Sequence, residues 1–424
     1  MKHIRNRRLV AVAALAIGLG AVPAAALAAA GAGGAAPRSA QAGTVSIGMS
    51  TTLSGSIASL GVGASQGAQL AVHDLNARGG VLGKKVKLII KDDGATPATG
   101  SDNVKGMILN DHVAAILGPV SSGVAGAEMP LADQYKTPIF LNVANSVTLL
   151  TKTWTKYGFQ LVPNTVMEPR GIAAYFQKYL GTRSVSVATF APDYVFGHST
   201  VDGFLKALKD LGINYTLVDQ EWPALGAPNI APQLSALISH HPQVTFNVQF
   251  GGDLVNFTNQ ALGYGFFKNT RIIGMYSYDP LKALSGKAPS GGIAFDRAPY
   301  WAIKTPQMAK FVQAYHKKFN DYPSEWAILA YTSVETWAYG VKKAKSLDGD
   351  AVSSAISGAT IPTIRGPVPI RACDHQAAVP EYVATVNGKK DPAAGFPLWT
   401  RPVFVAPASK TMLSCDESLA LRPH

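Results

Sequence analysis

The chain has 424 residues, of which 47% are hydrophobic and only 15% are charged. This length is more than one ordinary domain needs and predicts two lobes, each with a sizeable buried core. The formal net charge is +12, five of the basic residues lie within the first 42, and no dense Lys/Arg run with interleaved aromatic residues occurs, so a nucleic-acid partner is not expected.

The N-terminus has the three parts of an export signal. A basic segment, MKHIRNRR, precedes the apolar stretch Leu9–Val22, and small residues follow as far as Ala40-Gln41-Ala42. The apolar stretch is short and rich in Ala and Gly, which favours a cleaved signal peptide over residues 1–42 rather than a membrane anchor. Arg7-Arg8 leaves a twin-arginine route open. With no cysteine near the cleavage site, we expect a periplasmic or secreted protein without a lipid anchor.

Strands and helices alternate along the first part of the mature chain. Val45–Met49 is expected to form a strand, Ser50–Gly63 a loop rich in Ser, Gly and Thr, and a helix is expected from about Ser65 to the Gly79-Gly80 pair. The alternation continues with strands at Val86–Ile90, Val113–Leu117 and Ile139–Leu141 and with helices at Pro97–Asn110 and after Ser122. This order predicts a parallel sheet covered by helices on both faces.

A second alternating run follows a polar, Pro-containing junction near Leu161–Thr165. Its expected helices are Met167–Leu180, Ser199–Gly212, Ile230–His240 and Leu254–Leu262, and its expected strands are Val185–Phe190, Tyr215–Val218, Val244–Val248 and Arg271–Met275. Helices are then expected at Pro306–Phe319, Glu325–Lys345 and Ala351–Ser357. Two strand-like pieces, Pro367–Ala372 and Tyr382–Val386, precede an irregular Pro-rich tail.

Two neighbouring strands of the first run end in loops rich in hydroxyl groups. Ser121 and Ser122 follow the strand that ends at Leu117 and stand where a helix begins, and Asn142–Ser146 follows the next strand. A helix N-terminus offers unpaired backbone N–H groups, which suit a carboxylate or another anion. Ligands bind at the carboxyl ends of the strands in open α/β sheets, so these loops are the first candidate site.

Four aromatic residues follow predicted strands of the second run: Tyr194, Phe196, Tyr276 and Tyr278. Packing in a core is the usual role of an aromatic side chain, but four at strand ends could line a cleft for a flat or apolar ligand. Both interpretations stay open from the residues alone.

Motifs that would indicate an enzyme or a metal centre are weak in this chain. Gly63-Ala64-Ser65-Gln66-Gly67 matches the pattern of a serine nucleophile, but no strand precedes it directly, and a helix start with Ser65 near its cap is the better interpretation. His240-His241 is expected to flank the last carbonyls of a helix, and Asp193 and His198 lack a third metal ligand nearby. We expect no enzyme activity, no cofactor and no metal.

The two cysteines, Cys373 and Cys415, lie near the C-terminus. In an exported protein this pair favours a disulfide that closes a loop of about 40 residues and contributes about 2–4 kcal/mol. Two free buried thiols are the alternative.

The chain resembles the substrate-binding proteins of ABC importers of the branched-chain amino-acid type, the Leu/Ile/Val-binding proteins. The resemblance extends over essentially the whole mature chain and rests on a series of short motifs in order: Leu53-Ser54-Gly55, Gly61, Gly67-Ala68, Asn76 to Gly83, Asp92-Asp93, Gly118-Pro119-Val120-Ser121-Ser122-Gly123 and Asp193-Tyr194-Val195-Phe196-Gly197.

The resemblance implies two Rossmann-like lobes with parallel sheets, joined by a three-crossover hinge, that close on a ligand (the type I periplasmic binding protein fold). By analogy the N-terminal lobe comprises residues 43–164 plus 300–363, and the C-terminal lobe comprises 165–299 plus 364–424. The family holds a ligand carboxylate at positions that look like Ser122 and Ser146 here, with a carbonyl at Ala144 and with Asn145 between them.

Three departures from the family pattern bear on the ligand. Leu60 and Phe196 stand where tyrosines are common, and Tyr276 stands where amino-acid binders carry an acid for the ammonium group. Asp279 is close enough in sequence to substitute for that acid. These changes favour a ligand without an ammonium group, a small carboxylate or amide with an apolar or aromatic body, over a branched-chain amino acid.

The sequence therefore predicts a monomeric solute receptor that delivers a small molecule to an ABC permease in the cytoplasmic membrane. One alternative is a periplasmic sensor that feeds a signalling receptor. A secreted serine hydrolase is a further alternative, which the position of Ser65 disfavours.

Overall fold

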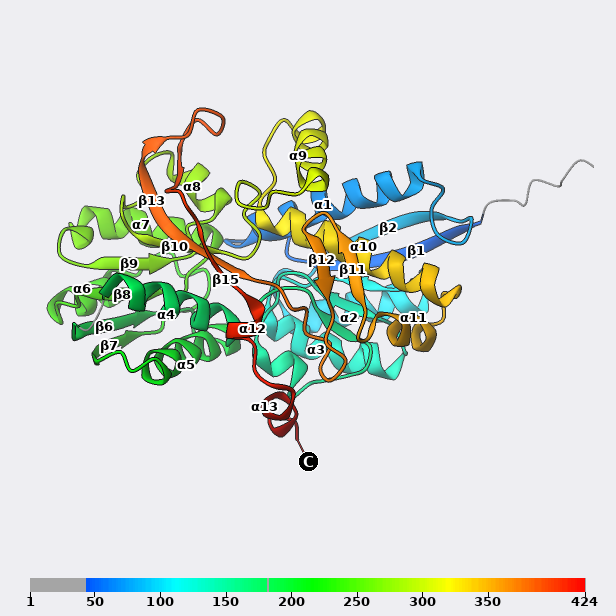
Figure 1. Ribbon diagram of the computed structural model, residues 1–424, viewed down its shortest axis with the longest axis horizontal. Helices are drawn as coiled ribbons and strands as arrows, with labels where there is room; N and C mark the ends of the chain where they lie inside the picture. Colours follow the sequence, from blue (N-terminus) through cyan, green and yellow to red (C-terminus); the bar gives the residue numbers. More distant parts are fainter. Residues whose placement is uncertain (1–42, 181–182, 424) are drawn as a thin grey trace, which may run out of the picture. The chain divides into compact units, whose positions relative to one another are not determined.

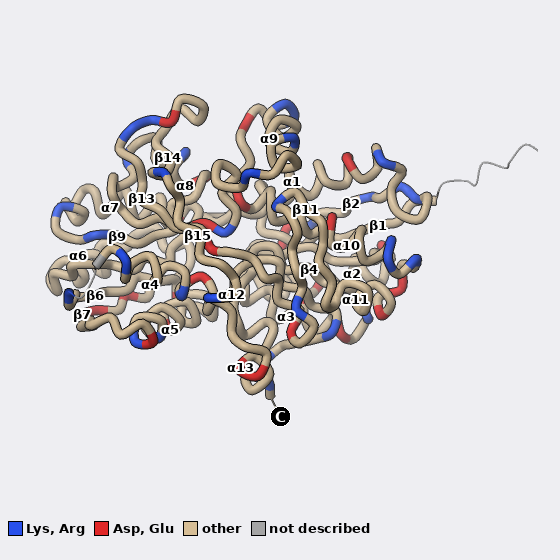
Figure 2. Tube along the Cα trace, viewed as in Figure 1, with Lys and Arg blue, Asp and Glu red and all other residues tan. Residues whose placement is uncertain are grey.

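The computed structural model describes residues 43–180 and 183–423 of the chain. The predicted signal peptide, residues 1–42, lies outside them. Among the described helices, none is both long enough and apolar enough to cross a membrane. Lys and Arg, and Asp and Glu, are scattered over the described chain (Figure 2).

The first sheet is parallel throughout and has the strand order β2-β1-β3-β4-β5. Its inner strands are buried apolar runs, as a sheet covered on both faces requires. The strands are β1 (Thr44–Thr51), β2 (Lys85–Asp92), β3 (Ile116–Leu117), β4 (Ile139–Leu141) and β5 (Gly158–Gln160).

Helices from two distant parts of the chain accompany this sheet. Helix α10 packs along α1 (Figure 1). The two helices can approach closely because Gly67 has no side chain: a Cβ at this position would lie 2.0 Å from the Ala327 carbonyl oxygen. The elements are α1 (Ala58–Ala77), α2 (Pro97–Leu109), α3 (Ser122–Gln134), the short 3₁₀ helix η1 (Val147–Leu150), α10 (Glu325–Ala344), α11 (Gly349–Ile356), and the hairpin strands β11 (Thr360–Thr363) and β12 (Gly366–Pro369).

The second sheet has the order β14-β13-β10-β9-β8-β6-β7, with β15 also paired to β13. Strands β6 to β10 run parallel, whereas β13 is antiparallel to β10, β14 and β15. The strands are β6 (Val185–Phe190), β7 (Tyr215–Glu221), β8 (Val244–Asn247), β9 (Arg271–Gly274), β10 (Ile293–Asp296), β13 (Glu381–Lys390), β14 (Pro397–Trp399) and β15 (Phe404–Ala406).

The remaining helical segments accompany or follow this sheet, and the last two of them, α12 and α13, are short. They are α4 (Met167–Leu180), α5 (Val195–Asp210), α6 (Ala231–Ser239), α7 (Gly251–Gly263), the 3₁₀ helix η2 (Phe266–Lys268), α8 (Tyr278–Leu284), α9 (Pro306–Phe319), α12 (Ala408–Thr411) and α13 (Cys415–Ala420).

The chain passes between the two sheets three times. It leaves the first sheet after β5, returns between β10 and α10, and enters the second sheet again between β12 and β13. The predicted fold class, two α/β lobes with parallel sheets, is confirmed. The residue boundaries of the lobes, 43–164 plus 300–363 and 165–299 plus 364–424, stay a prediction.

Several predicted boundaries were wrong. Helix α1 begins at Ala58, so the last six residues of the predicted loop at Ser50–Gly63 are helical. Its glycines are sites of close packing rather than loop signals, because a Cβ on Gly61 would lie 1.8 Å from the Thr52 carbonyl oxygen. Helices also begin at Val195 and Tyr278, strand β10 was not predicted, and the tail contains short strands and helices.

The predicted disulfide is confirmed, because Cys373 and Cys415 are bonded, with their Cα atoms 6.0 Å apart. The bond ties α13 to the segment that follows β12. Two further contacts hold the same tail: the Arg170 guanidinium donates to the Met412 carbonyl oxygen at 2.9 Å, and the Ser418 hydroxyl donates to Asp374 at 2.8 Å.

Candidate functional site

The loop after β3 brings Ser122 to the edge of the first sheet. Gly118 makes the turn with φ +104°, and a Cβ there would lie 2.0 Å from the Ser50 carbonyl oxygen. Ser121 is the N-cap of α3, where its hydroxyl accepts from the Gly123 N–H at 3.2 Å. Ser122, the first residue of the helix, then faces the loop that follows β4.

The loop after β4 is fixed against Ser122 by a backbone hydrogen bond. The Ser146 N–H donates to the Ser122 hydroxyl oxygen at 3.2 Å, which leaves the hydroxyl hydrogen of Ser122 free to donate elsewhere. The side-chain amide of Asn145 donates to the Pro163 carbonyl oxygen at 3.0 Å and to Glu168 Oε2 at 2.9 Å. These hydrogen bonds fix the loop after β3, which carries Ser122, and the loop after β4, which carries Asn145. A binding site requires side chains that are held in place in this way.

A cavity lies between these loops and the carboxyl-end loops of the second sheet; we call it the interlobe cavity. Its walls are mostly apolar, and its polar groups are Ser122, Asn145, Tyr194 and Arg297. The apolar lining residues are Leu60, Val120, Val143, Phe196, Phe250, Met275 and Trp326. Its volume is about 10 Å³, enough for about one water molecule. A solute can therefore enter only if the lobes separate and close again around it.

Arg297 is the charged residue in the wall of this cavity, and sequence reasoning missed it. Its side chain is 2% exposed, Nε donates to Glu168 Oε2 at 3.0 Å, and Nη1 donates to the Val143 carbonyl oxygen at 2.9 Å. The guanidinium lies 5.2 Å from the centre of the Trp326 ring. Nη2 makes no hydrogen bond within the described residues, so its two N–H groups are left for a ligand.

The acids around Arg297 are buried, and none of them lines the cavity. Burial raises the pKa of Asp296 and of Glu381 well above the usual range of a carboxyl group. Burial also raises the pKa of Glu168, although the Arg297 charge opposes this shift. Glu168 Oε2 accepts from Arg297 and Asn145, whereas Oε1 has no hydrogen-bond partner among the described residues, and Glu168 does not line the cavity.

The structure brings four of the nine predicted binding residues to the interlobe cavity: Ser122, Asn145, Tyr194 and Phe196. The other five do not line it. Ser121 and Ser146 cap helical segments, and the Ala144 carbonyl oxygen accepts from Gln160 Nε2 at 3.3 Å. The hydroxyl group of Tyr276 lies 3.1 Å from that of Thr258, and the Tyr278 hydroxyl donates to Asp321 at 2.7 Å.

The loop positions predicted for the aromatic residues were partly wrong. Tyr194 is the N-cap residue of α5, Phe196 lies in its first turn, and Tyr278 opens α8. Phe196 and Phe250 pack edge to face, with ring centres 5.4 Å apart, and so form an apolar wall opposite Ser122. That wall accounts for the largely apolar character of the cavity.

The features that would indicate an enzyme are not assembled at Ser65. It lies inside α1 rather than near a helix cap as predicted, and its hydroxyl donates to the Val62 carbonyl oxygen at 2.8 Å. The strand-turn-helix elbow of a serine hydrolase is not formed there. His240 contacts the Ala236 carbonyl oxygen at 3.0 Å, as predicted for a helix end. Within the described part of the chain, no group of three metal-ligating side chains is found.

Comparison with known proteins places the chain in a family. The model of the periplasmic binding protein family matches residues 44–391. The chain belongs to the periplasmic binding protein family. Members of this family bind solutes rather than transform them, and the predicted relation to the Leu/Ile/Val-binding proteins of ABC importers is confirmed.

The relatives include both amino-acid and aromatic-acid binding proteins by name. Leu/Ile/Val-binding protein homolog 7 of Brucella abortus is 26% identical over 341 residues, which cover 77% of this chain and 84% of that protein. A solute-binding protein of an ABC transporter from Rhodopseudomonas palustris, solved with 3,4-dihydroxybenzoic acid, has a TM-score of 0.74 and 25% identity, and covers 86% of this chain and 98% of that one. A periplasmic binding protein from Burkholderia mallei has a TM-score of 0.80 and 21% identity. The match covers 88% of this chain and 97% of that protein.

Proposed function

We propose that this protein is exported, captures a small carboxylic acid or amide with an apolar body in the interlobe cavity, and delivers it to an ABC permease. The observation that carries the ligand class is Arg297, a buried cation with a free Nη2 in the cavity wall. The relative from Rhodopseudomonas palustris, solved with an aromatic acid, supports the same class of ligand.

The ligand's acid group would lie between the two lobes. The Ser122 hydroxyl hydrogen comes from the first lobe, and Arg297 Nη2 comes from the segment that follows β10. Charge-assisted hydrogen bonds of this kind are about twice as strong as neutral ones. The wall of Phe196 and Phe250 would cover the apolar body of the ligand.

An α-amino acid fits this cavity less well. Its ammonium group would need an acid, and the lining residues include none. Burying that cation without a partner costs several kcal/mol. Asp279, the proposed substitute, also does not line the cavity. The names of the Brucella relatives favour branched-chain amino acids as the competing ligand class.

A thermal-shift screen decides between these classes. It compares benzoate, benzamide, aliphatic acids and leucine, isoleucine and valine at equal concentration. We expect the acids to raise Tm most, since a ligand that binds only the folded state stabilises it. If a branched-chain amino acid gives the largest shift and the acids give none, the assignment of the ligand class is wrong.

Replacement of Ser122 tests the site itself. Ser122→Ala removes the free hydroxyl donor and is expected to weaken acid binding by about 1–3 kcal/mol. Ser121→Ala is the matched control, because Ser121 caps α3 but does not line the cavity. It should lower stability by about 1 kcal/mol and leave the affinity unchanged. Equal losses of affinity in both variants would place the ligand elsewhere.

A further inference from the structure

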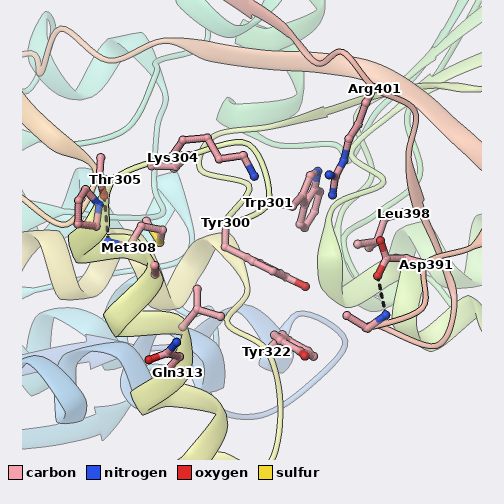
Figure 3. A pocket seen from close by; sticks show the side chains of 15 residues that line it. Tyr300, Trp301, Lys304, Thr305, Met308, Gln313, Tyr322, Asp391, Leu398 and Arg401 are labelled. Carbon is pink, nitrogen blue, oxygen red and sulfur yellow. Dashed lines mark hydrogen bonds between the residues drawn. The ribbon is translucent and has the colours of Figure 1, made fainter.

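A second, larger cavity lies beside the segment that leads from β10 to α9; we call it the crossover cavity. Its volume is about 610 Å³, and it shares no lining residue with the interlobe cavity. Its walls come from residues 300–306, from α9, from the loop before α10 and from the β13–β14 hairpin (Figure 3). A cavity of this size is typical of sites for small organic molecules.

One wall of the crossover cavity is aromatic. The rings of Tyr300 and Tyr322 are stacked, with centres 5.5 Å apart and an angle of 5° between their planes. Trp301 packs edge to face on Tyr300, with ring centres 5.1 Å apart. Ile303, Met308 and Leu398 add apolar surface. Such a wall suits a flat, apolar body.

Three hydrogen-bond donors at the crossover cavity have no partner within the described residues. Trp301 is 6% exposed, yet its indole Nε1 makes no hydrogen bond, and leaving a buried donor unpaired costs free energy. Lys304 and Arg401 are exposed and make no ion pair or hydrogen bond in the described part of the chain. Figure 3 shows both head groups pointing toward the Trp301 indole.

The acid that lines the crossover cavity, Asp391, forms no ion pair with Lys304 or Arg401 within the described residues, so two cations and one acid leave an excess of positive charge. Asp391 Oδ1 accepts from the N–H groups of Ala393 and Ala394 at 3.0 and 3.1 Å, so it is occupied in the turn of the hairpin. The cavity therefore combines an aromatic wall with positive charge and an unpaired indole donor. An anionic group on an aromatic body complements all three features.

We propose that the crossover cavity is a second ligand site, which binds a small aromatic anion with its acid group at Trp301 Nε1, Lys304 and Arg401. The aromatic body of the ligand packs against Tyr300, because Tyr322 is already stacked on Tyr300 and on His316. The site does not depend on the function proposed for the interlobe cavity.

Calorimetric titration of the full mature protein tests this site with three probes: naphthoate, naphthyl phosphate and the neutral naphthamide. We expect both anions to bind and naphthamide to bind about tenfold more weakly or worse, since it lacks the charge. The two anions distinguish a carboxylate from a phosphate ligand. Naphthamide binding as tightly as the anions, or no binding of any probe, would overturn the proposal.

Variants assign the binding to the crossover cavity. The double variant Lys304→Gln/Arg401→Gln should lower the affinity for the anions about tenfold or more. The control is Lys310→Gln/Lys317→Gln, which changes two exposed residues of α9 outside the cavity and should leave that affinity unchanged. Trp301→Phe keeps an aromatic ring and removes the indole N–H, so it should weaken binding of the anions, and the lost packing of a buried ring should lower Tm. Ser122→Ala should leave this binding event intact. Equal affinities in the two double variants, or loss of the event in Ser122→Ala, would refute the second site.

Discussion

At the scale of single residues, Arg297 and Glu168 connect ligand binding to folding. Arg297→Gln leaves Glu168 buried without its partner, and breaking a buried pair on one side costs about 3–5 kcal/mol of stability. Arg297→Gln/Glu168→Gln removes both charges and should recover most of that loss. Calorimetric unfolding and titration with benzoate, if the screen selects it, should show a stable double variant that no longer binds the acid. Retention of binding by that variant would exclude Arg297 as the anchor.

Asp279 makes the stability of the fold depend on pH, and the direction of its pKa shift sets the sign. Burial, together with the nearby acids Glu325 and Asp321, raises the pKa of Asp279 to about 7. The folded state then binds its proton more tightly than the unfolded state, so stability is highest below pH ~4 for this group and falls as the pH rises through about 7. In Asp279→Asn the free energy of unfolding should decrease with rising pH by about 1–3 kcal/mol less than in wild type.

Denaturant unfolding of wild type and Asp279→Asn at pH 5 and pH 8 measures this effect. The variant should lose less stability between the two pH values than wild type does. It should also keep the ligand preference, because Asp279 does not line the interlobe cavity. Parallel pH profiles would contradict the assignment, and a changed ligand preference would restore Asp279 as a binding residue.

Ser122 and Asn145 could be predicted from the sequence, whereas Arg297 could not. The two loop residues follow buried strands, and the carboxyl ends of parallel strands share an edge. Arg297 follows β10, a strand that was not predicted, and its partner Glu168 lies 129 residues away in sequence. Pairing over that distance depends on the tertiary packing of α4 against the segment after β10, which no local pattern records.

At the scale of elements, the N-terminus of α7 contacts the segment before α1 in the other lobe. The Gly252 N–H donates to the Ser56 carbonyl oxygen at 3.0 Å, and a Cβ on Gly252 would lie 2.4 Å from that oxygen. Gly252→Ala should therefore oppose closure and weaken ligand binding by about 1–3 kcal/mol. Gly263→Ala on the same helix, where a Cβ meets nothing within 4 Å, should bind as wild type does. Equal affinities in a titration would show that this contact does not limit closure.

The disulfide holds the C-terminal helices. Cys373 and Cys415 are separated by 42 residues, and the loss of such a link costs about 2–4 kcal/mol. Cys373→Ala/Cys415→Ala should lower the free energy of unfolding by that amount without changing ligand affinity. The bonded cysteines lie outside both cavities, so a loss of affinity would contradict this account.

Helix boundaries were the least predictable feature at this scale. Met167–Leu180 and Pro306–Phe319 were predicted as observed, because their apolar residues recur at helical spacing between clear end signals. The start of α1 was missed because Gly61 and Gly63 resemble loop residues. They serve close contacts to Thr52 and Ser324 that come from tertiary packing.

At the scale of the whole molecule, the two lobes contact each other around a cavity with room for about one water molecule. The Ser146 and Ser199 hydroxyl oxygens, one from each lobe, lie 3.3 Å apart. Other hydrogen bonds between the lobes include Gly252 to Ser56, Asn145 to Glu168, Arg297 to Val143 and Tyr278 to Asp321. A neutral hydrogen bond contributes about 1 kcal/mol and one to a charged group about 1.5–3 kcal/mol, so these bonds favour contact between the lobes. A ligand that bridges the lobes would shift the population toward the closed form.

Small-angle X-ray scattering tests this central claim most directly. The radius of gyration of the mature protein is measured without ligand and at saturation with the acid that gives the largest thermal shift. We predict a smaller radius with the acid, and a radius unchanged by the same acid in Gly252→Ala at equal concentration. An unchanged radius in the wild-type protein at saturation would contradict the closing of two lobes on a solute.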